Sequence, residues 1–171
     1  MTRHSEQRLL PYSAAEIYDL VADVARYPEF LPWTAAARIT RRAPLVGGPE
    51  GSEVMEADLV ISFKLFRERF ASRVTLLPRV RIETDYLNGP FKHLKSHWSF
   101  AEIPGGCRVG FEVDFEFRNI ILQGIIGVVF TEAMQRVVRA FEKRAAELYG
   151  ARPGVTRGSG GASPPTPPRD I

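Results

Sequence analysis

The chain has 171 residues and a hydrophobic fraction of 44%, so its length and composition suit one globular domain with a substantial core. Its 23 lysines and arginines exceed its 20 acidic residues, which makes the protein basic but well short of a dedicated nucleic-acid binder, and we expect no DNA partner. Cys107 is the single cysteine and excludes an internal disulfide.

The N-terminal part of the chain predicts a strand and then two short helices. Residues 2–10 alternate in polarity and carry no apolar core of a signal peptide, so we expect a strand and no leader. Ser13 and Glu16 have the spacing of a capping box, which predicts a helix start. Prolines then break the helix and leave a short irregular segment that holds three aromatic residues, Tyr27, Phe30 and Trp33, together with Leu31.

Six further strands are expected between residues 35 and 117. Residues 35–42 are a candidate second strand, and clear alternation follows from residue 52 onward. Arginines at one parity of the fourth strand predict an exposed basic row, formed by Arg67, Arg69 and Arg73. The apolar parity of the later strands predicts a buried face that includes Phe63, Phe70, Val74, Trp98, Phe111, Val113 and Phe115.

Residues 119–149 predict one long helix, because apolar residues recur at spacings of three and four without a proline. The stretch 120–130 is almost wholly apolar but falls short of the roughly 18–20 residues that span a bilayer, which leaves contact with a membrane surface open. Gly124 and Gly127 lie in this stretch. Since glycine is unfavourable inside a helix, we expect a sheet, a ligand or a lipid to approach the helix closely there.

The order of these elements predicts an α+β fold, in which a strongly curved antiparallel sheet wraps around the long C-terminal helix. We expect one domain over residues 1–150. Residues 151–171 are rich in glycine, proline and serine without apolar periodicity, which predicts a disordered tail.

Motifs for common chemistries are missing from the sequence. It has no HExxH, CxxC, GxSxG, GxGxxG or P-loop pattern, so we expect no metal, no nucleotide cofactor and no catalytic residue. His93 and His97 are expected on the wet outer face. The polar residues at inward positions are Ser72, Thr84 and Glu102, which is thin support for a cyclase or hydratase activity.

The apolar inward residues predict either a filled core or a cavity, because both have the same periodicity. If a cavity exists, the sheet residues listed above would face Ile125, Val128 and Val129 of the long helix. The aromatic segment at residues 27–33 and the apolar helix start favour a cavity with an apolar mouth.

Four segments carry a resemblance to a known family: LPYSAAEIYDLVADVARYPEFLPW, FKLFRERFASRV, GPFKHLKSHWSF and VDFEFRNIIL. Over residues 2–149 the chain resembles the Coq10/START-like family (SRPBCC, polyketide cyclase-like), whose bacterial members are also known as RatA-type ribosome-association toxins. The resemblance implies a helix-grip (START or Bet v 1-like) fold and a lipid cavity under the C-terminal helix.

The resemblance also implies a function and a set of site residues. It implies non-catalytic binding of a polyprenyl quinone such as ubiquinone, in support of respiration, at the cytoplasmic side of a bacterial inner membrane. The alternative it implies is a toxin that binds ribosomal subunits and inhibits translation. The implied ligand-binding residues are Tyr27, Phe30, Trp33, Phe63, Phe70, Val74, Trp98, Phe111, Phe115, Ile125 and Val128, and the implied membrane contacts are Ile121, Ile125 and Val129.

Overall fold

The computed structural model describes residues 2–63 and 65–154 and contains the predicted elements in the predicted order. They are β1 (Thr2–Leu10), α1 (Ala14–Ala22), the 3-10 helix η1 (Val24–Glu29), β2 (Thr34–Pro44), β3 (Glu53–Phe63), β4 (Phe66–Leu77), β5 (Arg81–Asn88), β6 (Phe91–Ile103), β7 (Gly106–Phe117) and α2 (Ile120–Tyr149). The 3-10 helix at residues 24–29 is the second of the two short helices predicted after the first strand, and it includes the start of the segment expected to be irregular. Most of the predicted tail, residues 155–171, lies outside the described residues.

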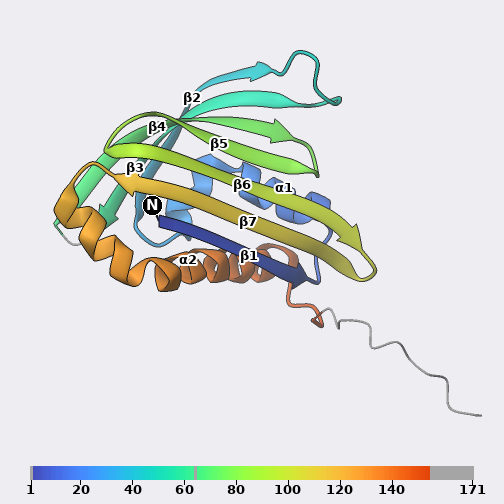
Figure 1. Cartoon of the computed structure of the whole chain (residues 1–171). Helices are drawn as coiled ribbons and strands as arrows, with labels where there is room; N and C mark the ends of the chain where they lie inside the picture. The colour runs from blue at the N-terminus through green and yellow to red at the C-terminus, as the bar shows by residue number, and fades with distance from the viewer. Residues whose placement is uncertain (1, 64, 155–171) are drawn as a thin grey trace, which may run out of the picture.

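The strands form one antiparallel sheet in the order β1-β7-β6-β5-β4-β3-β2. Figure 1 shows the sheet curving around α2, with α1 on the same side of the sheet. Both helices contact β7 and each other. Because the apolar face of the sheet and the apolar stripe of α2 bury one another, this is the expected helix-grip arrangement, and the predicted fold class is confirmed.

Alternation along β7 explains why one face of the sheet is apolar. Successive side chains of a strand point to opposite faces, so every second residue of β7 is directed toward the helices. These residues are between 4% and 7% exposed, and they are Val109, Phe111, Val113, Phe115 and Phe117.

The two halves of α2 differ in burial. Asn119 caps the helix, since its side chain accepts hydrogen bonds from the backbone N–H groups of Ile121 and Leu122. In the second half, Val138, Phe141 and Ala145 are buried against the sheet. In the first half, apolar side chains stay exposed, namely Ile120 at 86%, Ile121 at 70% and Val128 at 87%.

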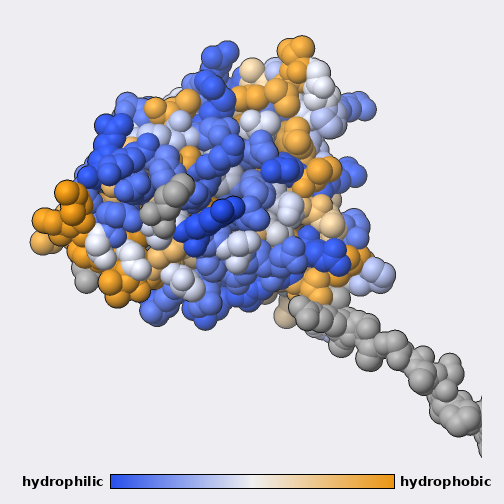
Figure 2. Space-filling view, in the orientation of Figure 1, coloured by the Kyte–Doolittle hydropathy of each residue, from blue (hydrophilic) through white to orange (hydrophobic). Residues whose placement is uncertain are grey.

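Figure 2 shows this apolar surface at the end of the molecule where α2 begins. By length and composition α2 could cross a membrane, a property that the core helices of globular domains share, and only 17% of its most apolar window is buried. The sheet, one of the neighbours expected at its glycines, does not approach them. A Cβ added at Gly124 or Gly127 would meet no atom of the described residues within 4 Å.

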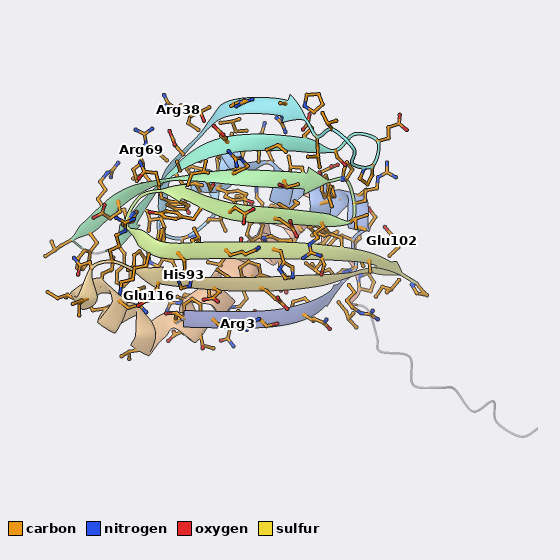
Figure 3. All side chains as sticks on the ribbon, turned by 45° about the horizontal axis from the view of Figure 1, so that its top comes forward. Arg3, Arg38, Arg69, His93, Glu102 and Glu116 are labelled. Atoms are coloured by element: carbon orange, nitrogen blue, oxygen red, sulfur yellow. The ribbon has the colours of Figure 1, made fainter. Side chains whose placement is uncertain are left out.

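The outer face of the sheet is polar, as Figure 3 shows for Arg38, Arg69, His93 and Glu116. The two histidines of β6 lie on this face, as predicted. His93 Nε2 is 3.0 Å from Asp114 Oδ1, and His97 Nε2 is 3.3 Å from Glu112 Oε2. These acidic residues of β7 therefore form a solvated outer stripe, away from the concave face.

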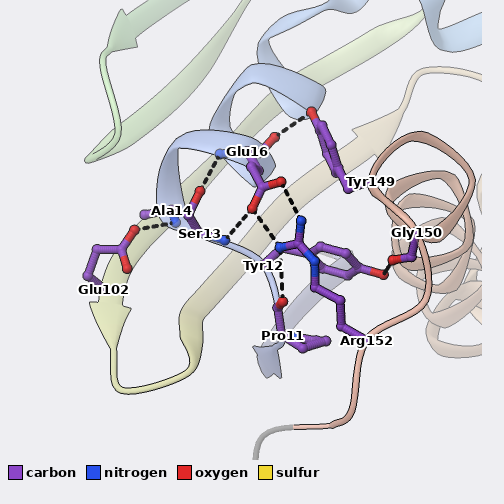
Figure 4. Close-up of polar contacts among 9 residues, drawn as sticks. All are labelled: Pro11, Tyr12, Ser13, Ala14, Glu16, Glu102, Tyr149, Gly150 and Arg152. Carbon is purple, nitrogen blue, oxygen red and sulfur yellow. Dashed lines mark hydrogen bonds and ion pairs between the residues drawn. The ribbon is translucent and has the colours of Figure 1, made fainter.

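The C-terminal end of α2 is fastened to the start of α1 (Figure 4). Arg152 donates from both terminal nitrogens to the Glu16 carboxylate, at 2.8 and 3.0 Å, and its guanidinium lies 4.9 Å from the centre of the Tyr12 ring. Tyr149 Oη donates to Glu16 O at 3.0 Å, and Tyr12 Oη donates to Gly150 O at 2.9 Å. Arg152 belongs to the predicted tail, yet it is held by the domain; we call these contacts the C-terminal clasp.

The guanidinium of Arg152, together with the backbone N–H of Ser13, lowers the pKa of Glu16 to about 2. The same carboxylate completes the predicted capping box: Ser13 Oγ accepts from the N–H of Glu16, and Glu16 Oε1 accepts from the N–H of Ser13. One side chain thus serves both the N-terminus of α1 and the end of α2.

Candidate ligand-binding site

A cavity of about 370 Å³ lies between the sheet and the first two thirds of α2. All but four of the residues that line it are apolar. The lining residues are Pro32, Trp33, Thr34, Ile61, Phe63, Phe66, Glu68, Phe70, Phe91, Leu94, Val113, Phe115, Phe117, Leu122, Ile126, Val129, Phe130, Glu132, Ala133, Met134, Arg136 and Val137.

The sheet wall of the cavity is aromatic. Phe91 stacks on Phe117, with ring centres 4.6 Å apart, and meets Phe70 and Phe115 edge-on at 5.3 and 5.7 Å. Phe91 starts β6 directly after the turn at Gly89, whose φ of 144° and close contact with Phe70 both require glycine. This turn therefore fixes the position of the ring at the centre of the wall.

The helix wall follows from the period of the α-helix. Leu122, Ile126, Val129, Phe130 and Ala133 recur at spacings of three and four, so they share the face that points to the sheet. Of these, Phe130 is 4% exposed and packs edge-on against Phe115 of β7, with ring centres 4.9 Å apart. That contact joins the helix wall to the sheet wall.

Polar contacts fasten α2 to β1 along one side of the cavity. Gln123 accepts from the N–H of Phe117 at 2.8 Å and donates to Thr2 Oγ1 at 2.7 Å. Nearer the C-terminal half of the helix, Arg8 of β1 donates to Glu142 at 3.0 Å. The exposed lining residues, Glu68 of β4 with Glu132 and Arg136 of α2, mark the mouth of the cavity.

Trp33 stands beside the sheet at this cavity in a strained backbone conformation. Its φ is 62°, a region that a bulky residue rarely adopts, and its carbonyl accepts from the N–H of Ser62 at 2.8 Å. Its ring meets Phe63 edge-on at 6.0 Å. Neighbouring structure thus holds Trp33 at the cavity wall at a cost of about 1–3 kcal/mol.

Four of the predicted ligand-binding residues line the cavity: Trp33, Phe63, Phe70 and Phe115. Five others belong to the packed half of the core instead. Phe141 of α2 fills that space, with ring centres 5.0 Å from Trp98, 5.5 Å from Tyr27 and 5.3 Å from Phe30. The residues to which this correction applies are Tyr27, Phe30, Val74, Trp98 and Phe111.

The helix residues also differ from expectation. Val128 points to solvent and Ile125 is half-buried outside the lining, whereas Val129, which was expected both at the cavity and at a membrane contact, lines the cavity. Each helical residue advances by about 100°, so the apolar stretch covers all sides of the helix and its sequence does not show which side is inward. Ile121 is exposed, and its contact with a membrane stays a prediction.

Sequence reasoning missed two groups of inward residues. One comprises the lining residues Phe91 and Phe117, for which the turn at Gly89 and the alternation of β7 were usable signals. The other is on β1, where His4, Glu6 and Arg8 occupy the inward parity opposite Val113, Phe111 and Val109. His4 Nε2 is 3.0 Å from Glu6 Oε2, and its ring lies edge-on to Phe130 at 6.2 Å.

Few of the side chains that line the cavity carry polar groups. Among its described lining residues there is no histidine, cysteine, serine or aspartate, and its polar residues are Thr34, Glu68, Glu132 and Arg136. The three polar candidates from the sequence lie elsewhere. Ser72 is fully buried with its hydroxyl unpaired, Thr84 is half-buried away from the lining, and Glu102 accepts from the N–H of Ala14 at 2.6 Å.

Comparison with known proteins gives a family and several relatives. The profile of the family described as polyketide cyclase / dehydrase and lipid transport matches residues 10–142. The ribosome association toxin RatA of Pseudomonas aeruginosa is 35% identical over 152 residues, which cover 88% of this chain and 100% of that protein. The mitochondrial coenzyme Q-binding protein COQ10 homolog B of Xenopus laevis is 32% identical over 152 residues, covering 86% of this chain and 59% of that protein.

A solved structure is similar at the level of both fold and sequence. The 18 kDa protein CC1736 of Caulobacter crescentus superposes with a TM-score of 0.71 at 32% identity, covering 88% of this chain and 100% of that one.

Proposed function

The chain belongs to the polyketide cyclase / dehydrase and lipid transport family, and from this membership we propose that it is a non-catalytic protein that binds a polyprenyl quinone. The observation that carries the proposal is the apolar lining of the cavity beneath α2. Each methylene that leaves water contributes about 0.8 kcal/mol, so such a lining can hold an isoprenoid chain with few polar contacts. The relative named for coenzyme Q binding supports the choice of a quinone.

The size of the cavity favours partial enclosure of such a ligand. Its volume of about 370 Å³ lies near the lower end of the range of about 300–1,000 Å³ that is usual for ligand sites. A ligand with a long isoprenoid tail would therefore place part of its length beneath α2 and leave the remainder outside.

The exposed apolar start of α2 gives the ligand a route to a lipid phase. Ile120, Ile121 and Val128 project from the helix, and Leu65, between β3 and β4, is 100% exposed. No charged residue occurs from Asn119 to Thr131, while Arg67 and Arg118 lie exposed nearby in the sequence. Apolar residues next to arginines suit insertion at an anionic membrane surface. We therefore place the protein peripherally at the cytoplasmic face of a bacterial inner membrane, where it would carry quinone in support of respiration.

The first experiment is organic extraction of the protein purified from a host with respiratory membranes, followed by ultraviolet absorbance and mass spectrometry. The expected result is a quinone at a molar ratio close to one per protein chain. An extract without quinone or another prenyl lipid would overturn the proposal.

A second candidate function is association with ribosomal subunits. The relatives named as ribosome association toxins favour it, and so does a row of exposed arginines on the outer face of the sheet. Arg38 and Arg69 both pair with Asp58, and Arg73 pairs with Glu56 at 3.3 Å, so part of the positive charge is neutralised within the protein. Arg67 forms no ion pair within the part of the chain that the structure describes.

Cosedimentation with ribosomal subunits at several salt concentrations tests this second function. Binding through phosphate groups falls steeply with salt, and it should weaken when Arg67 and Arg69 are replaced by alanine. Retention of subunit binding in that variant, or binding that does not respond to salt, would count against the arginine row as the contact surface.

A further inference from the structure

The polar residues of the cavity gather on two facing sides of its mouth. On the sheet, Thr34 of β2 lies opposite Ile61 of β3, which lies opposite Glu68 of β4, so these three side chains form a row on the concave face. On the helix, Glu132 and Arg136 are one turn apart and line the same cavity. We call Thr34, Glu68, Glu132 and Arg136 the polar rim.

On the helix side, the charged residues of the polar rim belong to the C-terminal part of the lining. Along α2, the lining is purely apolar from Leu122 to Phe130, and charged residues enter it only at Glu132 and Arg136. At about 1.5 Å per residue, Leu122 and Arg136 are roughly 21 Å apart along the helix axis. The cavity is therefore amphipathic along its length.

Within the part of the chain that the structure describes, one carboxylate of the polar rim has no partner. Glu132 Oε1 and Arg136 Nη2 are 3.3 Å apart, and the two side chains are 66% and 58% exposed, respectively. An ion pair that is so exposed is weak, so both side chains can contact a ligand instead. The Glu68 side chain forms no hydrogen bond or ion pair with the described residues. Two carboxylates thus face one guanidinium, and the lining carries a net negative charge.

We propose that the polar rim binds the head of an amphipathic ligand and selects heads that are uncharged or cationic over carboxylates, an inference that rests on the proposed function. The Arg136 guanidinium donates to a carbonyl or hydroxyl oxygen, and the Glu68 and Glu132 carboxylates accept from a hydroxyl or an ammonium. A fatty-acid carboxylate meets two like charges at the mouth. The ligand therefore lies with its head at the polar rim and its chain beneath the apolar part of α2.

Competition among three ligands with the same chain tests this selection. Dodecanol, dodecylamine and dodecanoic acid would each displace the uncharged fluorescent dye N-phenylnaphthylamine from the full-length protein, at a pH where the acid is ionised and the amine is protonated. We expect the alcohol and the amine to compete at least about fivefold more strongly than the acid. If all three compete equally, selection by the polar rim is overturned and apolar binding stands. If none displaces the dye, the proposed function falls as well.

Two variants assign the selection to named residues. Glu68→Gln and Glu132→Gln each remove one rim carboxylate with little change in shape. Each should reduce the ratio between the competition strengths of the alcohol and the acid by about threefold or more. Glu50→Gln is the matched control, because it changes the net charge equally at an exposed turn between β2 and β3. An unchanged acid-to-alcohol ratio in both rim variants, or an equal change in the control, would overturn the assignment.

Discussion

Val128 and Val129 are adjacent in α2 but face different environments: Val128 is 87% exposed, whereas Val129 lines the cavity. The pair separates the two roles proposed for the start of the helix, since one side chain can change the cavity and the other can change only the outer surface.

Tryptophan at these two positions tests the cavity. Val129→Trp should fill part of the space beneath α2. The amount of bound quinone or dye should fall by about tenfold, because the tryptophan ring occupies space that the ligand needs. Val128→Trp places the same side chain in solvent and should leave ligand content unchanged. Extraction and dye titration of both variants measure the difference, and equal ligand content in the two would show that the cavity is not the binding site.

Aspartate on the exposed face tests membrane contact. Ile121→Asp with Val128→Asp puts two charges where apolar side chains would enter the headgroup region, and we expect cosedimentation with anionic vesicles to fall by about tenfold or more. Leu148→Asp is the control, because Leu148 is 47% exposed at the other end of the same helix. If the control weakens vesicle binding as strongly, the start of α2 is not the contact surface.

The C-terminal clasp predicts a pH-dependent contribution to stability. Because the pKa of Glu16 is lowered to about 2, its ionised form stabilises the fold above its ordinary pKa of 4.5, and this contribution disappears as the pH falls toward 2. Arg152→Ala should therefore lower Tm near neutral pH by on the order of 2 °C, with a difference that shrinks below pH 4.5.

The control for the clasp is Arg139→Ala, which removes an arginine on the exposed side of α2 that forms no ion pair with the described residues. Thermal unfolding followed by circular dichroism across pH measures both variants. A Tm difference for Arg152→Ala that stays constant down to pH 2 would contradict the role of Glu16.

Ser72 provides a test of the enzyme alternative. Its hydroxyl is fully buried and has no hydrogen-bond partner among the described residues, so Ser72→Ala should be neutral or should raise the free energy of unfolding by about 1 kcal/mol. Ligand content should not change, because Ser72 does not line the cavity. Urea unfolding measures the free energy of unfolding, and organic extraction measures the ligand content. Loss of ligand in the variant would indicate that Ser72 belongs to the functional site.

Trp98→Ala should act on stability first. The ring is 7% exposed and packs 4.5 Å from Phe111 and 5.0 Å from Phe141, measured between ring centres. Truncating a buried tryptophan costs about 3–5 kcal/mol. We expect a large fall in the urea midpoint, and a fully stable variant that lacks ligand would instead place Trp98 at the binding site.

Local signals in the sequence predicted most of the fold. The capping box at Ser13 and Glu16, the N-terminus of α2 after Asn119 and the alternation of β7 each depend on residues within a few positions of one another. The family resemblance then supplied the helix-grip arrangement, which the sheet order and the solved relative confirm.

The candidate site was harder to predict, because filled and hollow parts of the core share one pattern. Trp98 and Leu94 are both on β6, opposite Phe111 and Phe115 of β7 respectively. The two pairs are four residues apart, about 13 Å along the strands, and only the second lies at the cavity. Phe141 marks the end of the filled region of the core. Its position depends on packing between segments that are distant in the sequence, and no local periodicity of the sequence encodes such packing.

The pairing of the first strand with the last has a consequence for biosynthesis. Thr2 lies opposite Phe115 and Leu10 opposite Cys107, so β1 remains without a partner until nearly the whole sheet has been synthesised. Such long-range contacts give the chain a high contact order, which slows folding and leaves an unpaired strand exposed meanwhile. We therefore expect that the sheet of the nascent chain is completed only after β7 has been synthesised, and that the cavity forms only after α2 has followed.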